Sequence, residues 1–543
     1  MMSVSQSKGC KVSAADSIIV RSNALAAPIP DPVEATPGDL NPQLLATSVW
    51  SDASVAAAGI PVLDVPVVSA GGGIGSFVLV DMLRIAGVPT NQIRVLSNLD
   101  FPWQTYEYLT RVSQIPRHER LRSDSSGMPD NPWGFPSYAW REARAERTVA
   151  PLFSVVVEPI FTDYWTPRAA TAFAGMEREA RRIGYFDTLA KGQVRLVRRR
   201  QGGGYFTLLT PPAGATATRR IAFRSRFVHL AVGYPGLRFL PDLQDYRQRY
   251  NDFTHVVNAY EPHEQVYEEL KRRPCVVMVR GGGIVASRVL QRLMEDRWNH
   301  RAPTTIVHLF RTFVSSTQDR GGAFYRRKGG NGFAYQGFNW PKGAWGGQLK
   351  TAFERLEGEE RAALYRKLGG THTPKRKLWQ QQMARARAEG WYHTVHGTVE
   401  TVTRTDHAQV SSRVKLANGS MTDIVADFVI DATGLEGDLR DHRLLADLLD
   451  HSNAGRNPMG RLDVEPTFEI RGTRSEPGGR LYASGSMTLG GYYAGVDSFL
   501  GLQYAALSMV DDLARQGFCP KISAGRSVSQ WLRYVRNQST GTP

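Results

Sequence analysis

Two glycine-rich segments limit the folds open to this chain more than any other feature of its sequence. The first, residues 67–77, reads VVSAGGGIGSF, and the second, residues 276–288, reads VVMVRGGGIVASR. Each follows a short apolar run and precedes residues with helical periodicity, a pattern typical of a strand, a tight turn and a helix. Such a turn presents backbone N–H groups and a helix N-terminus to a pyrophosphate. The sequence therefore predicts two separate dinucleotide-binding units.

The first loop follows the G-x-G-x-x-G pattern except at its third small position, where the chain has a serine. Its predicted cofactor contacts are Gly71, Gly73, Gly75 and Ser76. The next strand is predicted at residues 92–96, and Ser97 and Asn98 stand where the pattern usually places an acid for the ribose. Ribose recognition at this loop is therefore open, and an ordinary glycine turn in an α/β sheet is the alternative.

The second loop matches G-x-G-x-x-A in full. Its predicted cofactor contacts are Gly281, Gly283, Ala286, Ser287 and Arg288. The following strand, residues 305–310, ends at Arg311 and not at an acid. Because a guanidinium fork matches a phosphate dianion, Arg311 favours the 2′-phosphate of NADPH over NADH, with Arg288 as a second candidate. A surface arginine without this role is the alternative.

Composition excludes several classes of protein. The 543 residues carry a net charge of +16, which favours anionic ligands such as pyrophosphates and carboxylates, and no nucleic-acid-binding motif accompanies the basic runs. No apolar run could cross a bilayer and no secretion signal is evident, so a cytoplasmic protein without a membrane partner is expected. The three cysteines are widely separated, which argues against a dithiol relay, and no metal site is predicted.

Four further segments resemble motifs of the flavoproteins with two dinucleotide-binding domains, particularly the class B flavin monooxygenases, which include N-hydroxylating and Baeyer–Villiger enzymes. These segments are LAVGYP at 230–235, FTHVVNAY at 253–260, DATG at 431–434 and YASG at 482–485. Two departures from the family pattern stand out. Ser486 replaces an aspartate, and the 253–260 segment lacks the family's glycine and has its histidine and aromatic residue one position too far apart.

The resemblance, which covers roughly residues 62–515, implies an α/β fold of two Rossmann-like doubly wound domains, with the NADPH-binding domain inserted within the FAD-binding domain. The implied division of the chain is a tail or wrapping segment at 1–60, an FAD-binding domain at 61–240 and 425–520, an NADPH-binding domain at 241–424 with a glycine- and aromatic-rich insertion at 319–349, and a C-terminal tail at 521–543.

The function implied by the resemblance is an FAD-dependent NADPH oxidoreductase. As a monooxygenase, it would use dioxygen and a C4a-hydroperoxyflavin to oxygenate a small substrate, with an anionic or amino-acid-like amine as the first choice. One alternative is an NADPH-dependent flavin reductase or dehydrogenase that inserts no oxygen. A second is a regulator that binds nucleotides without turnover. The oligomeric state is open.

The resemblance and the loops also suggest further site residues. His255 is expected to help orient the nicotinamide, with a structural histidine as the alternative, and Asp124 is a candidate polar group of the substrate pocket. Trp103 and Gln104 are expected to wall the flavin site, although ordinary loop packing is the alternative. The remaining expected cofactor contacts are Ala432, Thr433, Gly434 and Gly485.

Overall fold

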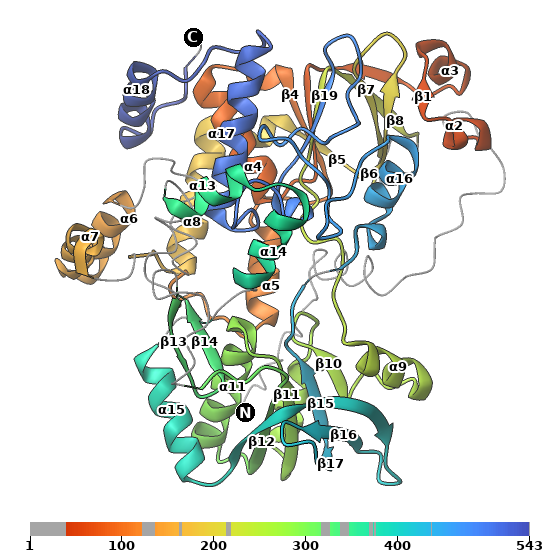
Figure 1. The fold of residues 1–543 in the computed structure, drawn as a ribbon. Helices are drawn as coiled ribbons and strands as arrows, with labels where there is room; N and C mark the ends of the chain where they lie inside the picture. The colour runs from red at the N-terminus through yellow and green to blue at the C-terminus, as the bar shows by residue number, and fades with distance from the viewer. Residues whose placement is uncertain are drawn as a thin grey trace, which may run out of the picture.

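The computed structural model describes most of the chain, namely residues 40–121, 136–161, 165–212, 219–315, 326–336, 347–368, 373, 376–435 and 437–541. They form two lobes, one above the other in Figure 1. The upper lobe is built on two five-stranded sheets and the lower lobe on one seven-stranded sheet.

The central sheet of the upper lobe is parallel, with strand order β19-β9-β3-β4-β5. Its strands are β3 (Val67–Ala70), β4 (Ile93–Ser97), β5 (Leu189–Lys191), β9 (Phe227–Leu230) and β19 (Arg480–Ala483). Every residue of β3, β9 and β19 is buried, as expected of parallel strands covered on both faces. The sheet therefore joins segments from distant parts of the chain.

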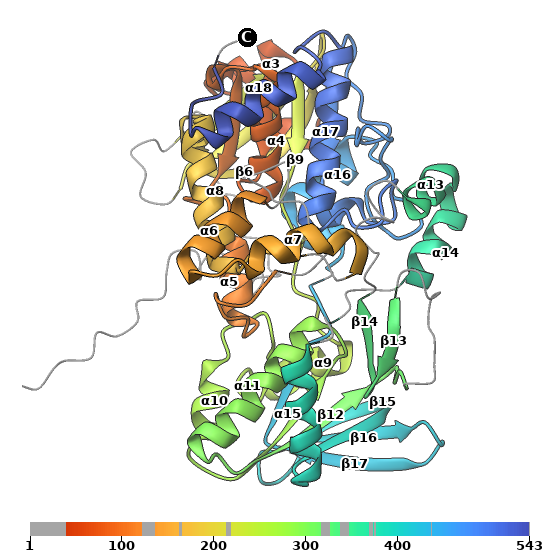
Figure 2. The same ribbon diagram turned by 90° about the vertical axis from the view of Figure 1, so that its left-hand side faces the viewer.

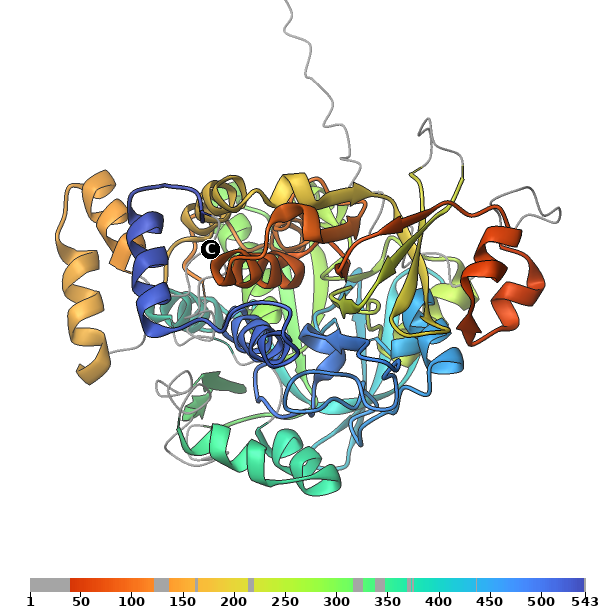
Figure 3. The same cartoon turned by 90° about the horizontal axis from the view of Figure 1, so that it is seen from above.

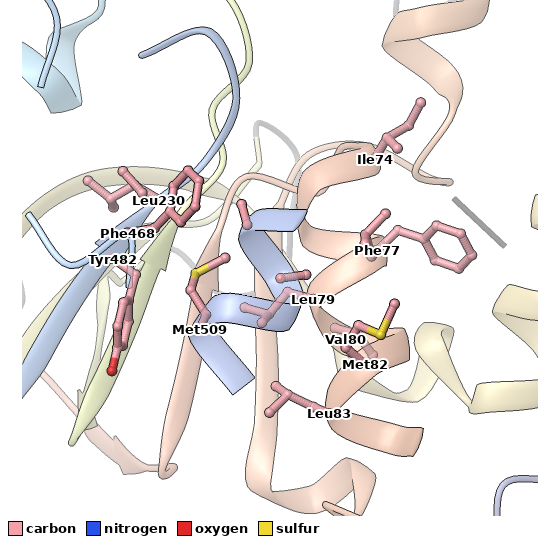
Figure 4. Packing of buried hydrophobic residues seen from close by; sticks show 14 of the residues in the cluster. Ile74, Phe77, Leu79, Val80, Met82, Leu83, Leu230, Phe468, Tyr482 and Met509 are labelled. Carbon is pink, nitrogen blue, oxygen red and sulfur yellow. The ribbon is translucent and has the colours of Figure 1, made fainter. Parts of the chain in front are cut away.

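Helices pack tightly against this sheet. They are α4 (Ile74–Ala86), α8 (Ala169–Ile183) and α17 (Phe499–Arg515). Helix α4 is apolar almost all round and ends at Gly87, whose φ of 100° gives a left-handed cap. Leu79 and Leu83 of α4 share one buried cluster with Met509 of α17 (Figure 4). The helix that follows the first glycine loop is thus at the centre of the lobe.

The second sheet of the upper lobe is mixed, with strand order β1-β6-β7-β8-β2. Its strands are β1 (Val49–Trp50), β2 (Val62–Asp64), β6 (Gln193–Arg200), β7 (Tyr205–Thr210) and β8 (Ile221–Ser225). Strand β1 lies between α2 (Pro42–Ala46) and α3 (Asp52–Ala57) and pairs with β6, and Trp50 is fully buried. Residues 40–60 are therefore integrated into this lobe, while the domain boundary near residue 60 stays a prediction.

The lower lobe has the strand order β10-β18-β11-β12-β15-β16-β17, parallel from β10 to β15 and antiparallel beyond. Its strands are β10 (Val256–Asn258), β11 (Cys275–Arg280), β12 (Thr304–Phe310), β15 (Tyr392–Arg404), β16 (Val410–Leu416), β17 (Met421–Ala426) and β18 (Phe428–Asp431). The chain enters this lobe after β9 and leaves it after β18. This confirms the predicted α/β class with one Rossmann-like unit inserted in another.

The other elements of the lower lobe are α9 (Pro241–Tyr250), α10 (Glu264–Leu270), α11 (Ile284–His300), α15 (Lys377–Ala388) and the hairpin β13 (Arg326–Gly330) with β14 (Phe333–Gln336). Phe333 and Tyr335 of β14 belong to the same buried cluster as Trp379 of α15. The hairpin therefore packs on the core of this lobe.

The remaining helices lie at the periphery or between the lobes. They are α5 (Gln104–Val112), α6 (Pro136–Glu146), α7 (Ala150–Phe161), α13 (Gln348–Arg355), α14 (Gly358–Leu368), α16 (Arg443–His451) and α18 (Ala524–Val535). Leu349 and Phe353 of α13 and Leu368 of α14 belong to the buried cluster of the upper lobe. Figure 2 shows both helices at the side of the molecule. Seen from above, α6 and α7 lie on the opposite side from α2 and α3 (Figure 3). None of the helices that the structure describes is both long and apolar enough to span a membrane.

Candidate cofactor-binding sites

Gly71 begins the first loop with a φ of +102°, a backbone conformation that L side chains rarely adopt. A Cβ atom at this position would lie 2.4 Å from the carbonyl oxygen of Ala231. The N–H of Ala231 donates a 2.8 Å hydrogen bond to the carbonyl of Ala70, and this bond holds Ala231 next to the loop. Glycine is therefore required here for the close approach of residues 230–235.

The N-terminus of α4 is open to a ligand. Gly73 is its N-cap, and no side chain caps the first turn. A Cβ atom at Gly73 would meet no described atom within 4 Å, whereas one at Gly75 would lie 3.2 Å from the hydroxyl of Ser484. The first N–H groups of a helix have no partner within the helix and carry its positive dipole end. These donors suit the pyrophosphate of a dinucleotide.

The second loop repeats this geometry in the lower lobe. Gly281 has a φ of +137°, and a Cβ atom there would lie 2.4 Å from the carbonyl oxygen of Ala432. Gly283 is the N-cap of α11, again without a side-chain cap, and the third small residue, Ala286, is fully buried. The first glycine of each loop thus packs on the alanine of a linker segment, Ala231 in one lobe and Ala432 in the other.

The linker at 431–434 is fixed by a buried carboxylate. The side chain of Asp431 accepts hydrogen bonds from the N–H and the hydroxyl of Thr433 and from the N–H of Leu240. Burial raises the pKa of Asp431. Gly434 follows with a φ of +140° and no described atom within 4 Å of a Cβ position. Thr433 and Gly434 therefore lie beside the second loop, where the chain returns to the upper lobe.

At the end of β4, next to the first loop, the chain has Ser97 and Asn98 and not an acidic residue. Ser97 accepts a hydrogen bond from the N–H of Leu99, and a Cβ atom at Gly72 would collide with the Ser97 side chain. The nearby carboxylate of Asp100 is 2.7 Å from the ammonium group of Lys191. Asp100 is thus the acid nearest to the end of β4 along the chain, and it forms an ion pair with Lys191.

Trp103 and Gln104 are buried at the start of α5, directly after this turn. The amide oxygen of Gln104 accepts a 2.8 Å hydrogen bond from the N–H of Asp100. The ring centroid of Trp103 lies 4.9 Å from that of Phe101. Both residues therefore hold the turn after β4 in shape, and their contact with a flavin stays a prediction.

Arg311 follows β12, whose carboxyl end lies beside the second loop because Arg280 pairs with Leu309. Arg311 is exposed, and no described residue forms an ion pair with it. Arg288 differs, since it is buried and its guanidinium lies 2.5 Å from the carboxylate of Glu119 in the upper lobe. Ser287 is also buried and donates a hydrogen bond to the carbonyl of Ile284. Arg311 is thus the more available partner for a phosphate.

The closing motif lies against the first linker. Gly485 has a φ of +83°, and Ser486 donates a 2.9 Å hydrogen bond from its hydroxyl to the carbonyl of Gly233. Tyr234 in turn donates a 3.0 Å hydrogen bond from its phenol to the carboxylate of Asp497. Ser486, a departure from the family pattern, therefore ties the segment before α17 to residues 230–235.

The structure places His255 away from the second glycine loop, so its expected role beside the nicotinamide stays a prediction. His255 precedes β10, and β10 runs parallel to β18 and β11, so this histidine lies at the amino ends of the strands. Gly281 follows the carboxyl end of β11, at the opposite edge of the sheet. His255 is instead bonded to Asp252 at 2.9 Å and stacks on Phe428. It lines a surface hollow of about 350 Å³ with Arg273, His407, Ala408, Gln409 and Asp427.

Asp124 and most of the 319–349 insertion lie outside the described residues, so their predicted roles stay predictions. Among the residues that the structure describes, no group of three or more potential metal ligands is assembled. Two buried histidines, His229 and His308, were not predicted from the sequence, and they bond to the glycine loops directly or through serines. Each stands in a Val-His-Leu triplet of a buried parallel strand. A polar residue within such an apolar run was the available signal.

No protein-family model matches this sequence. No curated protein matches it either. Solved structures do resemble it in fold. An ornithine hydroxylase from Pseudomonas aeruginosa has a TM-score of 0.56 at 14% identity, with 84% of this chain and 100% of that chain covered.

Two further structures resemble the chain more closely in shape. The ornithine N-hydroxylase of Kutzneria sp. 744, solved with reduced FAD, NADP⁺ and L-ornithine, has a TM-score of 0.60 at 14% identity over 84% of this chain and 100% of that one. An FAD-bound cadaverine monooxygenase of desferrioxamine biosynthesis from Erwinia amylovora has a TM-score of 0.60 at 12% identity over 84% and 95%. At these identities the likeness establishes the fold alone.

Proposed function

We propose, from a fold shared with N-hydroxylating flavin monooxygenases, that this chain is an FAD- and NADPH-dependent enzyme that hydroxylates a small amine. The observation that carries the proposal is the pair of matching glycine loops, each with a left-handed first glycine packed on a linker alanine and an uncapped helix behind it. One loop alone is common to many nucleotide-binding proteins. Two loops joined by the linkers at 230–235 and 431–434 suit a nicotinamide that meets a flavin.

The chain offers a separate site to each cofactor. We assign FAD to the first loop and α4, within residues 61–240 and 425–520, and NADPH to the second loop and α11, within 241–424. FAD held there would supply the redox chemistry that carries electrons from NADPH to dioxygen. The protein's share is to orient the two nucleotides through its helix N-termini and linkers and to keep water from the reacting rings.

The substrate class follows by analogy. The similar structures are an ornithine hydroxylase, an ornithine N-hydroxylase and a cadaverine monooxygenase. The net charge of +16 favours a ligand that also carries a carboxylate. A small amino acid with a side-chain amine therefore fits better than a plain diamine. A cytoplasmic location is part of the same proposal.

The test begins with anaerobic NADPH, which should bleach the flavin absorbance of the purified protein. Oxygen consumption should then rise on addition of ornithine, lysine or cadaverine, with a hydroxylamine formed in proportion to the NADPH used. If, with each of these amines, the hydrogen peroxide formed equals the NADPH oxidised, the chain is a flavin reductase. If the protein takes up no FAD, the proposal fails altogether.

Arg311 offers an independent check on the choice of nicotinamide. In Arg311→Ala, the preference for NADPH over NADH, measured as the ratio of kcat/KM values for flavin reduction, should fall at least about tenfold, because a charge-assisted hydrogen bond contributes roughly 1.5–3 kcal/mol. The control is Arg301→Ala, at the exposed end of α11. An unchanged ratio in Arg311→Ala would remove its assigned role.

A further inference from the structure

A chain of buried polar side chains lies behind the first glycine loop. It consists of Ser69 on β3, Ser76 on α4, His229 on β9 and Ser484 after β19, all at most 2% exposed. The two ring nitrogens of His229 lie 2.9 Å from the Ser69 hydroxyl and 2.8 Å from the Ser484 hydroxyl. Ser69 lies 2.8 Å from Ser76, which bonds to the carbonyl of Gly71.

The protons of this chain can be placed one by one. A carbonyl only accepts, so the single hydroxyl proton of Ser76 points to Gly71. Ser76 must then accept from Ser69, which uses the only proton of Ser69 and leaves its oxygen to accept from Nδ1–H of His229. Burial lowers the pKa of His229 to about 3, so the ring is neutral and its Nε2 accepts from Ser484. His229 is therefore the Nδ1–H tautomer.

The second loop has a shorter counterpart. His308 on β12 is fully buried, with Nε2 2.6 Å from the carbonyl of Gly281 and Nδ1 3.0 Å from the phenol of Tyr392. Because the carbonyl only accepts, Nε2 carries the proton. Burial lowers the pKa of His308 to about 4, so this ring is also neutral and Nδ1 accepts from Tyr392. His308 is the opposite tautomer from His229.

Both arrangements end on the same atom of the loop, the carbonyl oxygen of its first glycine. The peptide bond is planar and trans, so its C=O and N–H point in opposite directions. A carbonyl of Gly71 that is held toward the buried side chains directs the N–H of Gly72 away from them. The same holds for Gly281 and Gly282. The buried side chains thus fix the direction in which the loop presents its donor.

We infer that His229 and His308 are positioning residues, one for each nucleotide, which fix the two pyrophosphate loops through opposite tautomers. His229 orients the loop for FAD and also ties it to the closing segment through Ser484, whereas His308 orients the loop for NADPH. This inference rests on the proposed function for the identity of the two ligands. Neither histidine touches a reacting atom.

Because the two histidines carry their proton on different ring nitrogens, substitution by asparagine and by glutamine should have opposite effects at the two positions. The amide N–H of asparagine can replace Nδ1–H, and that of glutamine can replace Nε2–H. In the full-length protein, His229→Asn should bind FAD within about threefold of the wild type and His229→Gln about tenfold more weakly. At the second loop the order reverses, so His308→Gln should keep NADP⁺ affinity and His308→Asn should lose about tenfold. Dissociation constants come from flavin fluorescence for FAD and from calorimetry for NADP⁺.

Two controls separate positioning from a general structural role. Ser412 is a buried serine of β16 in the lower lobe, and Ser412→Ala should change neither dissociation constant. His229→Gln should weaken only FAD binding, and His308→Asn should weaken only NADP⁺ binding. Equal losses for both nucleotides in either variant, or the same preferred isostere at both positions, would overturn the inference. A wild-type protein that binds neither FAD nor NADP⁺ would instead overturn the proposed function.

The tautomers can also be measured directly by ¹⁵N NMR. In protein labelled with ¹⁵N-histidine, His229 should show a protonated Nδ1 and a bare Nε2, and His308 the reverse, with both patterns unchanged between pH 8 and pH 6. The resonances are assigned from the His229→Asn and His308→Gln samples. This measurement needs no turnover and no cofactor. Two histidines with the same tautomer would contradict the proton placement.

Discussion

Gly281→Ala is expected to give a protein that is still yellow but that NADPH can scarcely reduce. The alanine Cβ would lie 2.4 Å from the carbonyl oxygen of Ala432, and a φ of +137° is strained for any L residue. The clash is with backbone, because the N–H of Ala432 is bonded to the carbonyl of Arg280, so the loop itself must open. Opening moves the N-terminus of α11 away from the pyrophosphate. We expect a loss of about a hundredfold in kcat/KM for NADPH, or ~2.7 kcal/mol.

The measurement is anaerobic stopped-flow reduction of the bound flavin over a range of NADPH concentrations. Gly419→Ala is the matched control, since Gly419 lies in the β16–β17 hairpin with a φ of +88° and no described atom within 4 Å of a Cβ position. It carries the strain of a left-handed alanine without the clash. Wild-type reduction kinetics in Gly281→Ala would show that the second loop does not hold NADPH.

Much of the fold was predictable because the decisive signals are local. Each glycine loop sits between a buried strand and a helix, and these three elements follow one another within a short stretch of chain. The return of the chain at 431–434 was predictable from the resemblance of its DATG segment to a family motif. The placement of α13 and α14 on the upper lobe was not, because Leu349 and Phe353 find their partners only through contacts distant in sequence.

The site was predicted less completely, for a physical reason. A sequence pattern indicates that a residue adjoins a strand, but the end of the sheet at which it lies depends on the direction of the neighbouring strands. His255 is such a case, since β10 runs parallel to β11 and puts it at the edge opposite Gly281. Ser76 was predicted as a cofactor contact and as a departure from the glycine pattern, but its buried hydrogen bonds were not predicted. Its partner Ser69 comes from β3, and the partner of Ser69, His229, comes from β9, so the chain of bonds becomes visible only when β3 and β9 pair.

Gly71→Ala is expected to give the complementary result, a protein without bound flavin that still binds NADP⁺. The Cβ would lie 2.4 Å from the carbonyl oxygen of Ala231, and the φ of +102° adds strain. The displaced loop would also lose the bond between the Gly71 carbonyl and Ser76, which fixes its donors. Because FAD binds only the folded protein, its loss should also lower the thermal midpoint.

Flavin content after purification, FAD affinity and NADP⁺ affinity are measured side by side, so that loss of FAD is distinguished from general unfolding. The control is Gly517→Ala, at the exposed end of α17, where a φ of +71° meets no described atom within 4 Å of a Cβ position. It should keep its flavin. Retained FAD in Gly71→Ala would assign the flavin to another site. Loss of FAD together with retained NADP⁺ binding, set beside the reverse pattern in Gly281→Ala, would assign one nucleotide to each loop.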